Sequence, residues 1–185
     1  MNEQDVFEIL VSELTSLMDN GNYYSALTLV LTIPGICASI DSERGSTQGK
    51  DEKLYKNWLN EYTCYKNNKR MLTSQIVYKT RCRLLHNGRF LSEKKDKNDK
   101  IDVYFALPAN IKLISDNGSV RITTNGKTYL QINIEDFVQN ILVGVSLWRQ
   151  KVCKTENYKN YVKDAIKFGL PHLGIGSDSN LPVLQ

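Results

Sequence analysis

The sequence predicts a mainly α-helical protein with a small antiparallel β-hairpin insert at about residues 101–132. Apolar residues recur at helical spacing through most of the chain, and they alternate with polar residues only in that insert. The chain has 185 residues, of which 41% are hydrophobic and 24% are charged, as in ordinary globular domains. We therefore expect one helical-bundle domain over residues 1–170 and a loose tail at 171–185.

The first two helices are expected over residues 4–20 and 22–40. In the first, the apolar residues at helical spacing are Val6, Ile9, Leu10, Leu14 and Leu17. The second is apolar on nearly all sides, so it should be the central, buried helix. Proline removes a backbone donor, so Pro34 and Gly35 should kink this segment or divide it into two short helices.

Two further helices should follow the loop at residues 41–51. Residues 51–65 carry an aromatic stripe with Trp58 and Tyr62, which suits core packing better than base stacking. Residues 71–88 form the fourth helix. Thr73 or Ser74 is suited to cap its start, and Gly88 is suited to end it.

The insert at 101–132 alternates apolar and polar residues and contains the pairs Asn117–Gly118 and Asn125–Gly126. Both pairs are strong hairpin signals, so two to four short strands are expected. The insert could cover one face of the bundle, serve as a recognition arm, or pair with a strand of a partner. Helical periodicity returns at residues 133–152, and a shorter helix is expected at 156–169.

Composition narrows the classes of function. The formal net charge of +4 permits contact with nucleic acid without requiring it. The four cysteines are widely spaced with no CxxC pair, so no disulfide framework, zinc site or cofactor is expected. The acidic start is unlike a signal peptide, and no apolar run reaches the ~20 residues that span a bilayer. These features favour a cytoplasmic protein without a membrane segment.

The stretch YKTRCRLLHNGRF, residues 78–90, carries the chemistry, with three arginines and one of the two histidines. Cleaving RNA without a metal requires a base for the 2′-OH, an acid for the leaving 5′-oxygen and positive charge beside the phosphorane. Histidine suits the proton transfers, and arginine suits the phosphoryl oxygens. Arg81 and His86 lie about 140° apart on an ideal helix. They can be brought to one site in three ways: the long arginine side chain extends around the helix, the last turn loosens, or two copies of the helix meet across a two-fold axis.

Arg81, four intervening residues and His86 resemble the R-x4-6-H motif of the HEPN superfamily. The resemblance covers roughly residues 5–90 and 134–151, and it implies a HEPN-like four- to five-helix bundle. Many family members are metal-independent ribonucleases of bacterial toxin–antitoxin or antiphage systems, with a composite site between the two copies of a homodimer. The resemblance thus implies that RNA is the substrate, that Arg81 and His86 are catalytic, and that an antitoxin or effector protein is a further partner. Active members often carry a polar residue after the motif arginine, where this chain has Cys82.

The candidate substrate-binding residues are Lys79, Arg83, Asn87, Arg89, Tyr78 and Asp41. Several have an ordinary alternative: the arginines as solvated residues or partners of acidic residues, Tyr78 as a packing residue, and Asp41 as the cap of a turn. His86 itself could be a helix-end histidine. The leading hypothesis is a HEPN-type endoribonuclease, and the alternative is a non-catalytic HEPN-like scaffold that binds RNA or protein.

Overall fold

The structure is a computed structural model, and it describes residues 6–42, 49–65, 72–89, 101–107, 119–124 and 127–164. Within these residues the chain forms six helices and one three-stranded sheet. The helices are α1 (Val6–Asp19), α2 (Tyr23–Asp41), α3 (Asp51–Tyr62), α4 (Ser74–Asn87), α5 (Ile134–Val152) and α6 (Glu156–Asp164). The strands are β1 (Ile101–Ala106), β2 (Ser119–Thr124) and β3 (Lys127–Asn133). The prediction of a mainly helical protein with a small sheet is confirmed.

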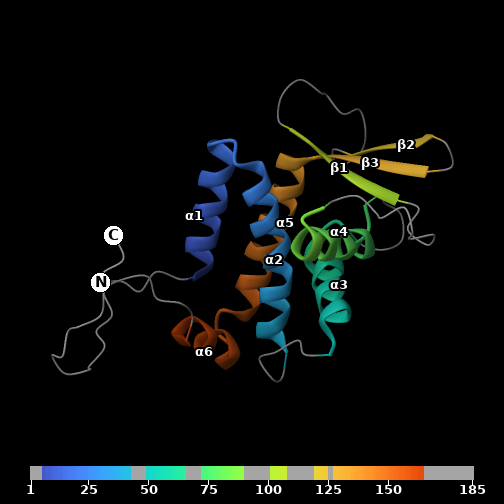
Figure 1. Cartoon of the computed structure of the whole chain (residues 1–185). Coiled ribbons are helices and arrows are strands. Elements are labelled where there is room, and N and C mark those ends of the chain that lie inside the picture. Colours follow the sequence, from blue (N-terminus) through green and yellow to red (C-terminus); the bar gives the residue numbers. More distant parts are fainter. Residues whose placement is uncertain are drawn as a thin grey trace, which may run out of the picture.

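Helix α2 is the central element, as its all-round apolar sequence predicts. It contacts α1, α3, α4, α5 and α6, and Figure 1 shows it between α1 on one side and α3 and α4 on the other, with α5 overlapping it in this view. Its buried side chains include Val30, Leu31, Ile33 and Cys37. Within α2 the exposed residues are Tyr24, Ser25 and Asp41 at its two ends, so the middle of the helix packs against other elements on nearly all sides and is apolar there.

Helix α2 runs as one helix through Pro34, so the alternative of two short helices is wrong. Proline 34 lacks the amide that would bond to the carbonyl of Val30, so one backbone hydrogen bond is lost. Its side chain is buried in the bundle, and Tyr55 of α3 packs beside Gly35, where a built Cβ would lie 3.7 Å from the Tyr55 ring. Packing on both sides of the proline therefore outweighs the missing bond.

The length of α2 bears on the expectation that no apolar run is long enough to span a membrane. With 19 residues and a mean hydropathy of 1.5, it is the one helix among those described that is long and apolar enough to cross a membrane. Half of that window is buried inside the bundle. The core helix of a soluble protein passes the same test, so the finding is weak evidence for a membrane segment.

The sheet has the strand order β1-β3-β2 and lies at one end of the bundle, beside α4 and the start of α5 (Figure 1). Strands β2 and β3 form the antiparallel hairpin that Asn125–Gly126 predicts, with Thr124 opposite Lys127. Strand β1, however, pairs with β3 in parallel, from Ile101 opposite Thr128 to Ala106 opposite Asn133. The expectation of a purely antiparallel insert is therefore wrong.

The sheet belongs to the core of the bundle. Val103, Leu130 and Ile132 are at most 2% exposed and pack with the helical core. Strand β3 continues directly into α5, where Asn133 caps the helix by accepting a hydrogen bond from the amide of Glu135 at 2.8 Å. The Asn117–Gly118 signal, the end of the helix expected at 156–169, and the tail at 171–185 lie outside the described residues.

Candidate functional site

Helix α4 begins and ends where the sequence predicts. The side chain of Thr73 accepts a hydrogen bond from the amide of Ile76. At the other end Gly88 adopts the left-handed conformation with φ of 62°, its amide bonds to the carbonyl of Leu84, and the amide of Arg89 bonds to the carbonyl of Arg83. This glycine-based ending keeps the helix regular up to Asn87.

The inner face of α4 is formed by Val77, Thr80 and Leu84, all of them buried. The hydroxyl of Thr80 donates to the carbonyl of Ile76 at 2.9 Å, so this buried polar group is satisfied. By helical geometry the opposite side carries Lys79, Cys82 and His86. We call these three residues the outer stripe of α4.

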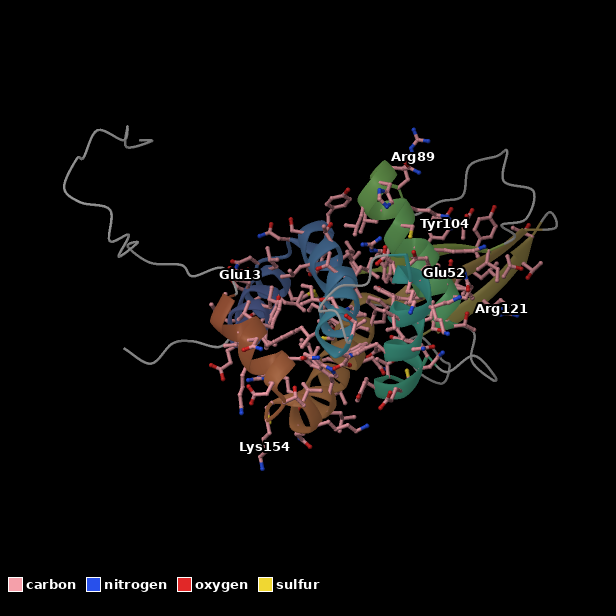
Figure 2. The ribbon with its side chains drawn as sticks, turned by 90° about the horizontal axis from the view of Figure 1, so that it is seen from below. Glu13, Glu52, Arg89, Tyr104, Arg121 and Lys154 are labelled. Carbon is pink, nitrogen blue, oxygen red and sulfur yellow. The ribbon has the colours of Figure 1, made fainter. Side chains whose placement is uncertain are left out.

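His86, Asn87, Gly88 and Arg89 are all exposed where α4 ends. Figure 2 shows Arg89 beyond the last turn of the helix, pointing away from the bundle. The end of α4 also adjoins the start of α2, because a Cβ built on Gly88 would lie 3.6 Å from the hydroxyl oxygen of Tyr24. A polymeric substrate can therefore reach His86 without any rearrangement of the described residues.

Arg81 lies on a different side of α4 from His86. Because the last turn keeps its regular geometry, the two positions remain about 140° apart around the helix. The guanidinium of Arg81 is directed to the sulfur of Cys82, with 3.9 Å between Nη1 and Sγ, and its charge acts on the buried Tyr55 of α3. A single copy of the chain thus does not place Arg81 and His86 on one face.

Tyr78 packs on α3, as its ordinary reading predicts. Its ring contacts the ring of Tyr55 edge to face, with centroids 5.4 Å apart. Burial, together with the neighbouring Cys82 sulfur, raises the pKa of Tyr78 to about 12. Tyr55 is fully enclosed and donates its hydroxyl to the carbonyl of Leu31 at 2.8 Å, which joins α3 to the middle of α2.

Lys79 lies close to an acidic group on α3. The carboxylate of Glu52 accepts hydrogen bonds from Lys56 at 2.8 Å and from Gln75 at 3.1 Å. These bonds lower the pKa of Glu52, and the positive charge of Lys79 lowers it further. Lys79 therefore balances charge between α3 and α4 as well as lying on the outer stripe.

Arg83 is directed to the sheet. Its Nη1 atom lies 4.0 Å from Oδ1 of Asp102 in β1, and the two side chains are only 13% and 1% exposed. A buried carboxylate needs a nearby positive charge, and Arg83 supplies one. The arginine expected to hold an RNA backbone is thus positioned to join α4 to β1.

Asp41 does not lie at the end of α4. It is the last residue of α2, whereas the end of α4 adjoins Tyr24 near the start of α2. Seventeen helical residues separate the two positions, or about 26 Å. Both carboxylate oxygens of Asp41 accept the indole hydrogen of Trp148 on α5, at 2.9 and 2.8 Å. Burial raises the pKa of Asp41, and the bond from Trp148 partly opposes that shift.

A cavity of about 510 Å³ adjoins the end of α4, and no sequence pattern indicated it. Its walls come from four elements: Tyr23 and Tyr24 at the start of α2, Arg89 after α4, Tyr104 and Phe105 of β1, and Ile134 of α5. Residues so far apart in the sequence meet only through the tertiary fold. The adjacent tyrosines Tyr23 and Tyr24, of which Tyr24 is exposed, are the local feature that could have suggested it.

Among the described residues no three His, Cys, Asp or Glu side chains cluster in a way that could hold a metal ion. The cysteines within these ranges are all free thiols, and burial raises the pKa of the Cys37 thiol in the core. The chain matches no family model, no curated protein and no solved structure. The expected relationship to the HEPN superfamily over residues 5–90 and 134–151 therefore stays a prediction from the sequence.

Proposed function

We propose that this chain is a metal-independent endoribonuclease of the HEPN type that acts as a homodimer in a bacterial toxin–antitoxin or antiphage system. The observation that supports the proposal most directly is the exposure of His86 in the last turn of α4, with Arg81 and Arg89 within five residues of it. A histidine sealed in the core could not reach a sugar–phosphate chain.

In this proposal His86 of one copy accepts the proton of the 2′-OH as that oxygen attacks the adjacent phosphorus. His86 of the second copy protonates the 5′-oxygen as its bond to phosphorus breaks. The products are a 2′,3′-cyclic phosphate and a free 5′-hydroxyl. The fixed positive charge of Arg81 stabilises the phosphorane between these steps.

A second copy is needed for two reasons. One histidine cannot be base and acid in the same cleavage step, and Arg81 does not share a face with His86 in one chain. If two copies meet along the outer stripe of α4, both His86 side chains reach one groove and the arginines flank it. Lys79 and Arg89 then contribute positive charge along the path of the RNA backbone.

The test is cleavage of RNA by the purified dimer in the presence of a chelator. Cleavage should persist, should leave 2′,3′-cyclic ends, and should fall at least about 100-fold in His86→Ala and in Arg81→Ala. The variant Arg121→Ala, an exposed arginine on β2, is a matched control and should cleave normally. Intact RNA after incubation with folded wild-type dimer would exclude the proposal.

A non-catalytic HEPN-like scaffold is the second candidate. Two observations favour it: Cys82 stands where active members often have a polar residue, and Arg81 is turned to that sulfur and to the aromatic cluster on α3. A scaffold would bind RNA or protein without cutting RNA. Binding to RNA should weaken steeply with added salt, whereas a protein partner would give a weaker dependence.

A further inference from the structure

We propose that the cavity beside α4 is a pocket for one unstacked nucleobase of single-stranded RNA. The pocket is defined by Tyr23, Tyr24, Arg89, Tyr104, Phe105 and Leu107. This inference rests on the proposed function, because the base would belong to the strand whose phosphate reaches His86. It adds a binding site whose residues lie outside the R-x4-6-H motif.

The pocket has the form of a ligand site. A volume of about 510 Å³ falls within the usual range for pockets that enclose small organic groups. Its lining is chiefly aromatic and aliphatic, with a single cationic side chain, Arg89. Flat apolar walls with one positive group suit a planar base attached to a phosphate, since the walls stack on the base while the cation meets the anion.

Exposed apolar side chains are concentrated at this pocket. Among the described residues six large hydrophobic side chains are exposed, and three of them line it: Tyr24 at 56%, Tyr104 at 43% and Leu107 at 58%. Exposing apolar side chains to water costs free energy. A cluster of them therefore indicates a surface that a ligand or partner covers. The ring of Tyr104 also contacts the ring of Tyr129 on β3, with the ring centroids 5.7 Å apart.

The position of the pocket beside the end of α4 indicates which ligand it binds. Arg89 is both a pocket residue and the third residue after His86, and a Cβ built on Gly88 would lie 3.6 Å from the Tyr24 hydroxyl. Figure 2 shows Arg89 beyond the last turn of α4, and Arg89 and Tyr104 line the same pocket. His86 is thus three residues of chain from a wall of the pocket, so a neighbouring nucleotide of a strand with its phosphate at His86 is the occupant that we propose. An uncharged apolar occupant would make no use of Arg89.

The experiment measures binding of a fluorescent single-stranded oligoadenylate to the full chain in a His86→Ala background, so that the RNA remains intact. Tyr24→Ser and Tyr104→Ser should each raise Kd about 5- to 150-fold, which is the range for loss of one base–aromatic stack. Tyr24→Phe and Tyr104→Phe keep the ring and should stay within about twofold. Leu147→Ser removes an equally exposed apolar side chain from α5 and should change nothing.

An abasic oligonucleotide provides the second arm. With no base to stack, it should bind the parent and the serine variants with equal affinity. Because both tyrosines are exposed, the serine variants should fold normally, and thermal melting monitored by circular dichroism checks this. Serine variants that bind oligoadenylate as tightly as the parent would overturn the pocket.

Cleavage by the chain with His86 intact separates this inference from the proposed function. Tyrosine-dependent binding without any cleavage would keep the pocket and exclude the nuclease. Cleavage whose KM does not change in the serine variants would keep the nuclease and exclude the pocket. If oligoadenylate does not bind at all, the pocket proposal falls, and cleavage of RNA by the chain with His86 intact still decides the nuclease.

Discussion

The indole nitrogen of Trp148 donates its hydrogen to both carboxylate oxygens of Asp41, at 2.9 and 2.8 Å. This contact joins the end of α2 to α5 across 107 residues of sequence. Asn157 of α6 adds a hydrogen bond to the carbonyl of Ile40 at 3.3 Å. The end of α2 is therefore held by two helices, and the acidic residue there has a structural partner.

Replacing Asp41 should affect stability and leave catalysis unchanged. Asp41→Ala leaves the buried indole nitrogen of Trp148 without an acceptor, so the free energy of unfolding should fall by about 1–2 kcal/mol. Asp41→Asn retains an acceptor and cannot ionise, so it should be close to neutral. Urea denaturation measures both variants. Loss of RNA cleavage by folded Asp41→Asn would instead support the prediction that Asp41 is a substrate-binding residue.

The pair formed by Arg83 and Asp102 gives a second prediction. Arg83→Ala leaves the carboxylate of Asp102 buried at 1% exposure without this positive charge. Removing one partner of a buried pair is strongly destabilising, and at 4.0 Å we expect the low end of that range, about 2–3 kcal/mol. Arg89→Ala, an exposed arginine, is the matched control and should lose less than about 0.5 kcal/mol.

A double-mutant cycle with Asp102→Ala checks the assignment of Arg83. If the two residues interact, the double variant should be more stable than the sum of the single losses predicts. Simple additivity would mean that Arg83 is not coupled to β1. Weakened RNA binding at unchanged stability would then support the original interpretation of Arg83 as a backbone contact.

Replacing each of two helical glycines with alanine should change the stability of the protein in opposite directions. A Cβ on Gly144 of α5 would lie 3.0 Å from the Thr63 side chain and 3.0 Å from the carbonyl oxygen of Tyr62, so Gly144→Ala should cost about 1–3 kcal/mol. A Cβ on Gly35 of α2 would meet only the Tyr55 ring at 3.7 Å. Gly35→Ala should therefore stabilise the protein by about 0.5–1 kcal/mol. Thermal or urea unfolding of both variants decides whether helix packing is as described.

The local features of the fold were predictable because they depend on neighbouring residues. Thr73 and Gly88 bound α4, and the apolar sequence of α2 places it at the centre. Features that depend on distant partners were missed. Nothing near Asp41 indicates Trp148, and nothing near residue 101 indicates that β1 runs parallel to β3. Pro34 predicts a break from local chemistry, and the break is prevented by packing that only the assembled bundle provides.

The candidate site shows the same contrast between local features, which were predictable, and features that depend on distant residues, which were not. Periodicity gave the 140° separation of Arg81 and His86, and the regular ending at Gly88 preserves it. The aromatic pocket could not be predicted, because its walls come from four separate elements. Arg83 could not be assigned either, since Asp102 lies beyond a charged segment and pairs with it only through the sheet.

The separation of Arg81 and His86 leads to a prediction about subunit exchange. If the site is composite, an active pair consists of Arg81 from one copy and His86 from the other. Mixing the inactive variants Arg81→Ala and His86→Ala should then restore weak cleavage, because a mixed dimer brings Arg81 of one copy to His86 of the other. With random exchange half of the dimers are mixed, and each lacks the second histidine that protonates the 5′-oxygen, so recovery should stay well below half of the wild-type rate.

A site built within one chain gives the opposite result. In that case the Arg81→Ala copy lacks the arginine and the His86→Ala copy lacks the histidine, so no mixture contains a complete pair. The control is a mixture of each variant with a chain that carries both substitutions, which should stay inactive under either arrangement. Exchange is verified by differential tagging before rates are compared. Restored activity in the first mixture alone would show that the catalytic groups of α4 act between two copies of the chain, as the 140° between them requires.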